Sequence, residues 1–219
     1  MTRQGRQIKV VAGKEQPNSV LSLMTDLVFV TITAYLLTSY ASILLSPVSL
    51  LVVIREVFIS VYLLMGLGFL AVRRSARMFT AKKADYLYTI VGYAAPLLFQ
   101  PTLYGKFPLI GALLETGGAA FVASAFLSLN RSFGLAPQNR GIKTAGAYRF
   151  IRHPMYLGYI LAEVGYVVDN FSEFNLFVLT ISVLFLVLRL RAEEQLLRQD
   201  PAYRNYSRKT RWKLLPFLF

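Results

Sequence analysis

The chain's only histidine lies in the stretch YRFIRHPMYLGY, residues 148–159, together with arginines and tyrosines. Pro154 suits the first turn of a helix, because its missing N–H has no intrahelical partner to lose there. Arg152 and His153 therefore lie at or just before a helix start, where free backbone N–H groups can bind a carboxylate or a phosphate. His153 and Tyr156 project from the same side of that helix. Aromatic and basic residues also gather at membrane interfaces without any chemical role, so the motif alone leaves both interpretations open.

A second group of chemically capable residues is the stretch LRLRAEEQLL, residues 188–197. Arg189 and Glu193 are four residues apart and lie on one helical face, with Glu194 beside them. Taken alone, the pair is more typical of a salt bridge on a solvated face. If a helical hairpin brings this group to the basic loop before Pro154, the two form a pocket with donors on one side and carboxylates on the other. Such a pocket suits a zwitterionic ligand.

The residue inventory excludes several kinds of chemistry. The chain has no cysteine and one histidine, so thiol nucleophiles and iron–sulfur clusters are excluded and a zinc site is disfavoured; we expect no metal. The net charge of +13 could indicate nucleic acid, but the basic residues lie at the ends of apolar segments. This placement indicates membrane lipids as partners and no nucleic acid. No obligate protein partner is indicated.

These residues are positioned by apolar helices. With 55% hydrophobic and 16% charged residues, the chain is too apolar for an ordinary soluble domain. Three of its six apolar segments reach the ~20 residues that cross a bilayer, and the third, fifth and sixth are short. We expect the fifth and sixth to form a hairpin that enters the membrane without fully crossing it. The segments are Val20–Leu45, Pro47–Val72, Tyr86–Gln100, Pro108–Leu129, Pro154–Val168 and Asn175–Leu190.

Basic residues predict the orientation. All but two of the 24 lysines and arginines, Arg55 and Lys106, fall before the first segment, from Arg189 onward at the end of the sixth, or in alternate connections. The positive-inside rule therefore places both termini and two basic loops in the cytoplasm. The predicted fold class is all-α, a polytopic membrane helix bundle of about five to six transmembrane helices, with a C-terminal hairpin that forms a cytoplasmic pocket. No linker divides it, so residues 1–130 and 131–219 form one integrated membrane domain.

Ionisable residues inside apolar segments are functional candidates, because each is costly in lipid without a partner. The sequence assigns them no role, because structural pairing explains such residues more often than ligand binding. No regular spacing links them into a proton relay. They are Asp26, Arg55, Glu56, Glu115 and Glu163.

The last third of the chain resembles the membrane-embedded methyltransferases typified by isoprenylcysteine carboxyl methyltransferase, which are related to phospholipid N-methyltransferases. Four pieces occur in order: GAYRFIRHPMYLGY, a hydrophobic hairpin, RLRAEEQLL and YRNYSRKTRWKLLP. The resemblance implies methyl transfer from S-adenosylmethionine to a lipophilic acceptor that enters from the bilayer, of the carboxyl O-methyltransferase type. It makes residues 131–219 the cofactor-binding and catalytic region. The first 120 or so residues carry no comparable signal.

The resemblance also implies roles for individual residues. Arg189 would face the methyl acceptor, and Glu194, or Glu163, would be the candidate base if the acceptor is an amine. The residues that would contact the cofactor are Arg140, Gly141, Ile142, Lys143, Tyr148, His153, Pro154, Met155, Tyr156 and Glu193.

The chemistry of this cofactor agrees with the inventory. A sulfonium makes its methyl group electrophilic, so the protein must mainly align donor and acceptor and exclude water. Three alternatives stay open: methylation of a phospholipid or another small lipophile, a sterol-reductase-like enzyme that uses NADPH, and a noncatalytic scaffold whose basic loops bind anionic lipid.

Overall fold

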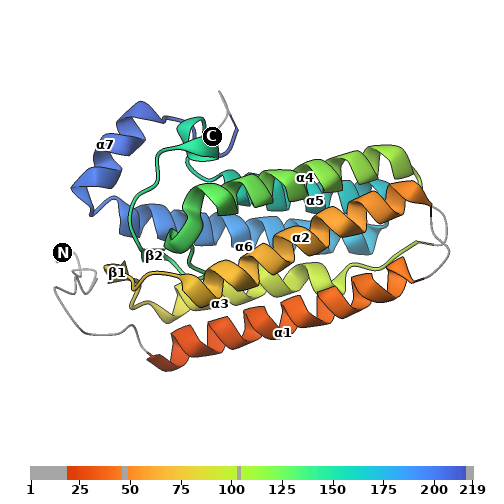
Figure 1. Cartoon of the computed structure of the whole chain (residues 1–219), viewed down its shortest axis with the longest axis horizontal. Helices are drawn as coiled ribbons and strands as arrows, with labels where there is room; N and C mark the ends of the chain where they lie inside the picture. The colour runs from red at the N-terminus through yellow and green to blue at the C-terminus, as the bar shows by residue number, and fades with distance from the viewer. Residues whose placement is uncertain (1–18, 46–48, 103–104, 216–219) are drawn as a thin grey trace.

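The computed structural model describes residues 19–45, 49–102 and 105–215. Within them α1 to α6 run along the long axis of a bundle, and α7 lies across one end (Figure 1). The prediction of an all-α membrane bundle is confirmed. The seven α-helices are α1 (Ser19–Leu44), α2 (Leu50–Val72), α3 (Lys83–Ala94), α4 (Pro108–Leu129), α5 (Pro154–Asp169), α6 (Glu173–Leu197) and α7 (Pro201–Lys209).

Four of these helices, α1, α2, α4 and α6, are long and apolar enough to cross a membrane. The chain is therefore a multi-pass membrane protein. Helix α3 has 12 residues and continues into the 3₁₀ turn η1 (Ala95–Leu98), where Pro96 cannot extend the α-helix. Helix α5 has 16 residues, close to its predicted length, and its incomplete crossing stays a prediction.

The prediction of a short sixth helix is wrong, because α6 has 25 residues. The Ser172 side chain caps its start by accepting a hydrogen bond from the Asn175 N–H at 3.0 Å. The helix then continues past Leu190 through its charged turn to Leu197. The predicted segment ended at Leu190 because the apolar residues end there. A helix needs only backbone hydrogen bonds to continue, and charged side chains of its last turns have partners at the end of the bundle.

Helices α4 and α5 form the most extensive helix pair, and glycines allow their close approach. A Cβ atom on Gly118 would lie 2.6 Å from the carbonyl oxygen of Gly158, and one on Gly165 would lie 2.7 Å from that of Gly111. Small residues are typical of such contacts between membrane helices. Helix α6 packs instead mainly along α3. The consecutive helices α5 and α6 thus have different principal neighbours.

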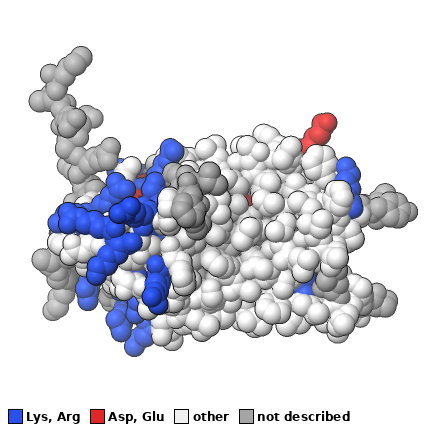
Figure 2. Space-filling model, turned by 90° about the horizontal axis from the view of Figure 1, so that it is seen from above, with Lys and Arg blue, Asp and Glu red and all other residues white. Residues whose placement is uncertain are grey.

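Lysine and arginine side chains gather at one end of the bundle, which we call the basic end (Figure 2). There the strands β1 (Met78–Phe79) and β2 (Gln138–Asn139) pair antiparallel, with Met78 opposite Asn139. The sequence did not predict this ribbon, which ties the loop after α2 to the loop after α4. The first basic group, Arg3, Arg6, Lys9 and Lys14, and the turn at Ser46 and Pro47 lie outside the described residues.

Most ionisable residues of the apolar segments are paired. Arg73 donates to Asp26, with 2.9 Å between Nη1 and Oδ1. The Nη2 atom of Arg55 lies 2.6 Å from Glu56 Oε1, and its Nη1 atom lies 3.6 Å from Glu115 Oε1. The contacts with Asp26 and Glu115 join neighbouring helices, whereas the pair of Arg55 and Glu56 lies within α2.

Candidate active site

A pocket lies at the basic end, where three parts of the chain meet, and we call it the basic-end pocket. Its walls come from the loop after α4, from the turn η3 (Gly146–Arg149) with the start of α5, and from the end of α6 with α7. It leaves about 690 Å³ of empty space, its open mouth included. All the predicted site residues except Pro154 and Glu194 line it: Arg140, Gly141, Ile142, Lys143, Tyr148, His153, Met155, Tyr156, Arg189 and Glu193.

The start of α5 is held by the C-terminal segment. Helix α5 begins at Pro154, as predicted, and His153 is its N-cap residue. The backbone N–H groups of Arg152 and His153 donate to the carbonyl oxygens of Trp212 and Lys213, both at 2.9 Å. These two N–H groups precede the helix. Those of Met155 and Tyr156, in its first turn, have no acceptor among the described residues, so the predicted free donors at this helix start remain.

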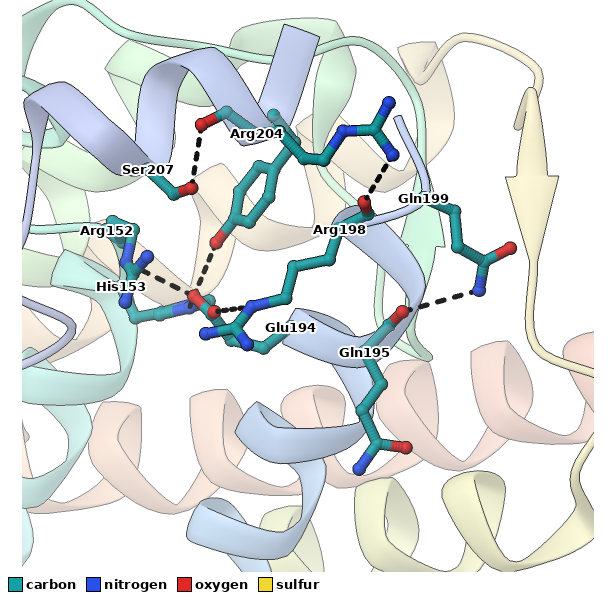
Figure 3. A network of polar contacts seen from close by, with 9 residues as sticks. Arg152, His153, Glu194, Gln195, Arg198, Gln199, Arg204 and Ser207 are labelled. Carbon is teal, nitrogen blue, oxygen red and sulfur yellow. Dashed lines mark hydrogen bonds and ion pairs between the residues drawn. The ribbon is translucent and has the colours of Figure 1, made fainter. Parts of the chain in front are cut away.

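The Glu194 carboxylate is surrounded by partners (Figure 3). Its Oε1 atom accepts from the Tyr203 hydroxyl at 2.5 Å and lies 2.9 Å from His153 Nε2 and 3.3 Å from Arg152 Nε. The Arg198 Nε atom lies 3.3 Å from its Oε2 atom. Burial, together with the negative charge of Glu194, raises the pKa of Tyr203, so its phenol stays protonated and donates. The structure thus places Glu194 behind the pocket wall, where it joins α5, α6 and α7.

Glu193 and Arg189 lie on the pocket surface and are not paired with each other. The Tyr156 hydroxyl donates to Glu193 Oε2 at 2.7 Å, and the Arg189 guanidinium carbon lies 5.1 Å from the centre of the Tyr156 ring. The ring of His153 meets Tyr156 edge-on at 5.5 Å. The salt bridge between Arg189 and Glu193, which the sequence suggested as the simplest interpretation, does not form in the described structure.

Arg189 is therefore a buried cation without a carboxylate partner among the described residues. Its side chain is 6% exposed, and its Nε atom has no hydrogen-bond acceptor. A buried charge is costly unless an opposite charge and hydrogen bonds compensate it. The site around Arg189 consequently favours an anionic ligand group.

The loop that contains Arg140 is fixed from both sides. Arg140 donates to the Gln138 side chain at 2.6 Å and to the carbonyl oxygen of Arg74, while its Nε atom has no partner. Burial, with a smaller contribution from nearby Arg73, lowers the pKa of Arg140 to about 10. The loop thus presents the buried Arg140 cation to the pocket. One donor of this side chain, the Nε atom, is unused.

The adjoining turn depends on Gly141 and Asn139. Gly141 has a φ of 108°, which side-chain-bearing residues rarely adopt. Its N–H donates to Asn139 Oδ1 at 2.9 Å, and Asn139 Nδ2 donates to Asp200 Oδ2 at 2.7 Å. Asn139 therefore connects the turn to the start of α7, a role that sequence reasoning missed.

Sequence reasoning also missed the two tyrosines of α7, which close the pocket. Tyr203 and Tyr206 both line it, and the Tyr206 hydroxyl donates to the Tyr148 carbonyl oxygen at 2.7 Å. Burial raises the pKa of Tyr206 to about 12, so this donor persists at neutral pH. Their Tyr-x-x-Tyr spacing was a signal, because it puts both rings on one helical face. Phe133 and Leu197, which also line the pocket, had no comparable signal.

A second hollow, which we call the membrane cavity, lies within the bundle. It leaves about 1220 Å³ of empty space, its open mouth included, and α1 to α6 all contribute to its walls. Arg189 lines this cavity as well as the basic-end pocket. The guanidinium thus lies where a polar ligand in one hollow can meet an apolar ligand in the other. Tyrosines provide much of the wall: Tyr35, Tyr40, Tyr62, Tyr93, Tyr159 and Tyr166.

Comparison with known families agrees with this arrangement. Residues 118–199 match the sequence model of the isoprenylcysteine carboxyl methyltransferase (ICMT) family. The match begins within α4 and ends just after α6, so it contains every predicted site residue. The family predicted from the sequence motifs is confirmed. No curated protein matches the chain.

Proposed function

Residues 118–199 belong to the ICMT family, and on that premise we propose that this membrane methyltransferase transfers a methyl group from S-adenosylmethionine to a lipophilic acceptor in the membrane cavity. The cofactor would bind in the basic-end pocket, and the acceptor would enter from the bilayer. The proposal fits a helix bundle in which polar groups are concentrated at one end.

The residues of the basic-end pocket fit this cofactor. Arg140 and Arg189 each have an unpartnered Nε donor, which suits the cofactor's carboxylate or an anionic acceptor. Glu193 offers a carboxylate to the amine or the ribose hydroxyl groups. When bound, the cofactor supplies an electrophilic methyl group, so no nucleophilic side chain is needed. The other cofactor contacts that we propose are Gly141, Ile142, Lys143, Tyr148, His153, Met155 and Tyr156, and Pro154 sets the start of the helix that carries them.

The observation that carries the proposal is the position of Arg189. It is buried, has no carboxylate partner in the described part of the chain, and lines both hollows. A guanidinium binds a carboxylate through two parallel hydrogen bonds, so Arg189 would orient an acceptor carboxylate beside the methyl donor. Tyr156 supports it by stacking below the guanidinium. A carboxylate loses no proton when it is methylated, so this reaction needs no base.

A second candidate function is methylation of an amine, as in phospholipid N-methyltransferases. The observation in its favour is Glu163, which lines the membrane cavity and has no ion-pair partner among the residues described. An amine must lose a proton on methylation, and Glu163, which lies deeper in the cavity, would receive it through water. Glu194, the other candidate base, lines neither hollow.

We also propose that the basic end faces the cytoplasm. The positive-inside rule gives this orientation, and the cofactor pocket would then open toward a soluble cofactor supply. The basic residues around it would contact anionic lipid headgroups.

Cofactor binding by the purified full-length chain in detergent tests the proposal. Isothermal titration is expected to give saturable binding of S-adenosylmethionine and none of NADPH. Binding of NADPH alone would indicate a reductase, and binding of neither would indicate a lipid-binding scaffold. Incubation of membranes that contain the chain with methyl-labelled S-adenosylmethionine should then label an extractable lipid, and identification of the product shows whether a carboxylate or an amine was methylated.

A further inference from the structure

Two carboxyl groups in the membrane cavity have no part in the methylation of a carboxylate at Arg189. Glu163 of α5 and Glu115 of α4 both line this cavity. They are 9% and 5% exposed, and Glu163 Oε2 and Glu115 Oε1 accept no hydrogen bond. Each such oxygen costs about 1–3 kcal/mol when it is buried without a donor. The cavity therefore contains acceptors that await a partner.

Glu163 differs from the other buried glutamates of the described chain. Glu56 and Glu194 are held in ion pairs, and Glu115 lies 3.6 Å from an Arg55 nitrogen. Glu163 has no cation beside it. Its polar neighbour is Ser182, whose fully buried hydroxyl lies near the carboxyl group without reaching hydrogen-bond geometry. Structural pairing thus does not account for Glu163.

The geometry of α5 places Glu163 deep in the cavity. Tyr156 lies in the basic-end pocket under Arg189, whereas Tyr159, Glu163 and Tyr166 line the membrane cavity on one helical face. At ~1.5 Å per residue, Glu163 lies roughly 10 Å along the helix from Tyr156. Glu115 lines the same cavity from α4, the helix that packs most extensively against α5.

The membrane cavity is consequently polar at two points. Arg189 provides a cation at the end beside the basic-end pocket, and the two glutamates provide acceptors deeper in the bundle. A purely hydrocarbon chain would fill the space but leave the deeper carboxyl groups unpaired. A ligand with a hydrogen-bond donor at that depth would satisfy them.

We propose that the methyl acceptor carries a hydroxyl or amine group in its membrane-buried part, roughly 10 Å from the methylated end, and that Glu163 binds this group. The inference rests on the proposed function, because it takes Arg189 as the site of the methylated end. It defines the substrate class as a lipid that is polar in mid-chain as well as at its head. Glu163 is then the residue that selects the acceptor.

Ligand-dependent thermal stabilisation tests this preference with three probes: palmitic acid, the same acid with a mid-chain hydroxyl group, and the same acid with a mid-chain amino group. The purified full-length chain in detergent is titrated with each, and the rise in melting temperature gives an apparent Kd. We expect about tenfold tighter binding of a mid-chain-substituted acid than of palmitic acid, the worth of one buried hydrogen bond. Whether the hydroxyl or the amine binds better identifies the donor.

Variants assign the preference to its residue. Glu163→Leu should bind all three probes alike, and Glu163→Gln should keep a preference for the hydroxyl probe because its amide oxygen still accepts. Glu56→Gln removes a buried carboxylate that lies outside the cavity and should leave the preference intact. Equal binding of the probes by the wild type, binding of none, or a preference that survives in Glu163→Leu would overturn the inference.

The same samples separate this inference from the proposed function. S-adenosylmethionine is titrated into each, and Glu163→Leu should bind it as the wild type does. A wild-type chain that binds the cofactor but does not distinguish the probes leaves the proposed function standing and refutes only the mid-chain donor. A chain that does not bind the cofactor refutes the proposed function.

Discussion

Glu194, behind the basic-end pocket, and Glu163, in the membrane cavity, are both buried carboxylates, and their surroundings differ. Glu194 has Arg152, His153 and Tyr203 around one oxygen and Arg198 at the other. One oxygen of Glu163 has no donor. A carboxylate surrounded by donors fixes the structure, whereas one with unused capacity is available to a ligand. Burial alone therefore did not separate structural from functional residues here.

The two hollows also differ in where their walls come from. The basic-end pocket is built from residues 129–206, whereas the membrane cavity takes residues from α1 to α6. The family match of residues 118–199 covers most of the pocket but only part of the cavity. Cofactor binding should thus depend on the C-terminal region alone, and acceptor choice on the whole bundle. Four substitutions test which residues of the C-terminal region stabilise the structure, orient the acceptor or bind the cofactor.

The largest effect is expected from Glu194→Ala, and it should be on stability. The change leaves Arg152, Arg198 and His153 without their shared partner, which costs about 3–5 kcal/mol for a buried pair. The melting temperature of the purified chain should fall by roughly 10 °C. Glu194→Gln keeps the shape of the side chain and some of its hydrogen bonds, so its melting temperature should fall less. An unchanged melting temperature in Glu194→Ala would show that the network is not structural.

The second-largest effect is expected from Arg189→Ala, and it should be on the rate of methyl transfer. Loss of the guanidinium that orients the acceptor should lower the rate of methyl transfer about 10²–10³-fold. The Kd for S-adenosylmethionine should change little, because other pocket residues remain. Arg191→Ala, on an exposed position of the same helix, is the matched control and should transfer normally. A rate loss that merely follows a loss of cofactor affinity would contradict the assigned role.

Glu193→Ala should act in the opposite way, on cofactor affinity. Removal of a charged hydrogen-bond partner is worth about 1.5–3 kcal/mol, so the Kd for S-adenosylmethionine should rise roughly tenfold to a hundredfold. Isothermal titration measures this change. Glu173→Ala removes an exposed glutamate at the other end of α6 and serves as the control. Normal affinity in Glu193→Ala would exclude Glu193 from the cofactor site.

The smallest effect is expected from Tyr206→Phe. It removes the hydrogen bond from the Tyr206 hydroxyl to the Tyr148 carbonyl oxygen and keeps the ring that lines the pocket. Stability should fall by about 1 kcal/mol, a few degrees in melting temperature, with little change in cofactor Kd. A Kd change as large as that of Glu193→Ala would mean that the hydroxyl itself contacts the cofactor.

Much of the site was predictable from the sequence because its signals are local. Pro154 marks the start of α5, and the spacing of Arg189 and Glu193 puts them on one helical face. The motif around the histidine indicated three residues that line the pocket, Tyr148, His153 and Tyr156. Of the partners of Glu194, Arg198 follows from the i,i+4 spacing, but Arg152, His153 and Tyr203 were not predictable, because they lie just before α5 and on α7.

By itself, the sequence determined that this is an all-α membrane protein whose residues 118–199 match the ICMT family, and it identified half of the residues that line the basic-end pocket. Hydropathy, helix-start signals and short motifs are sufficient for that, because each acts over a few residues of chain. Only the tertiary structure decided that α6 runs its full length, that Glu194 is enclosed while Arg189 and Glu163 keep unused hydrogen-bonding atoms, and that Arg189 lies between two hollows. Those properties depend on which helices pack together, and close contacts such as those of α4 with α5 are formed by residues far apart in the chain.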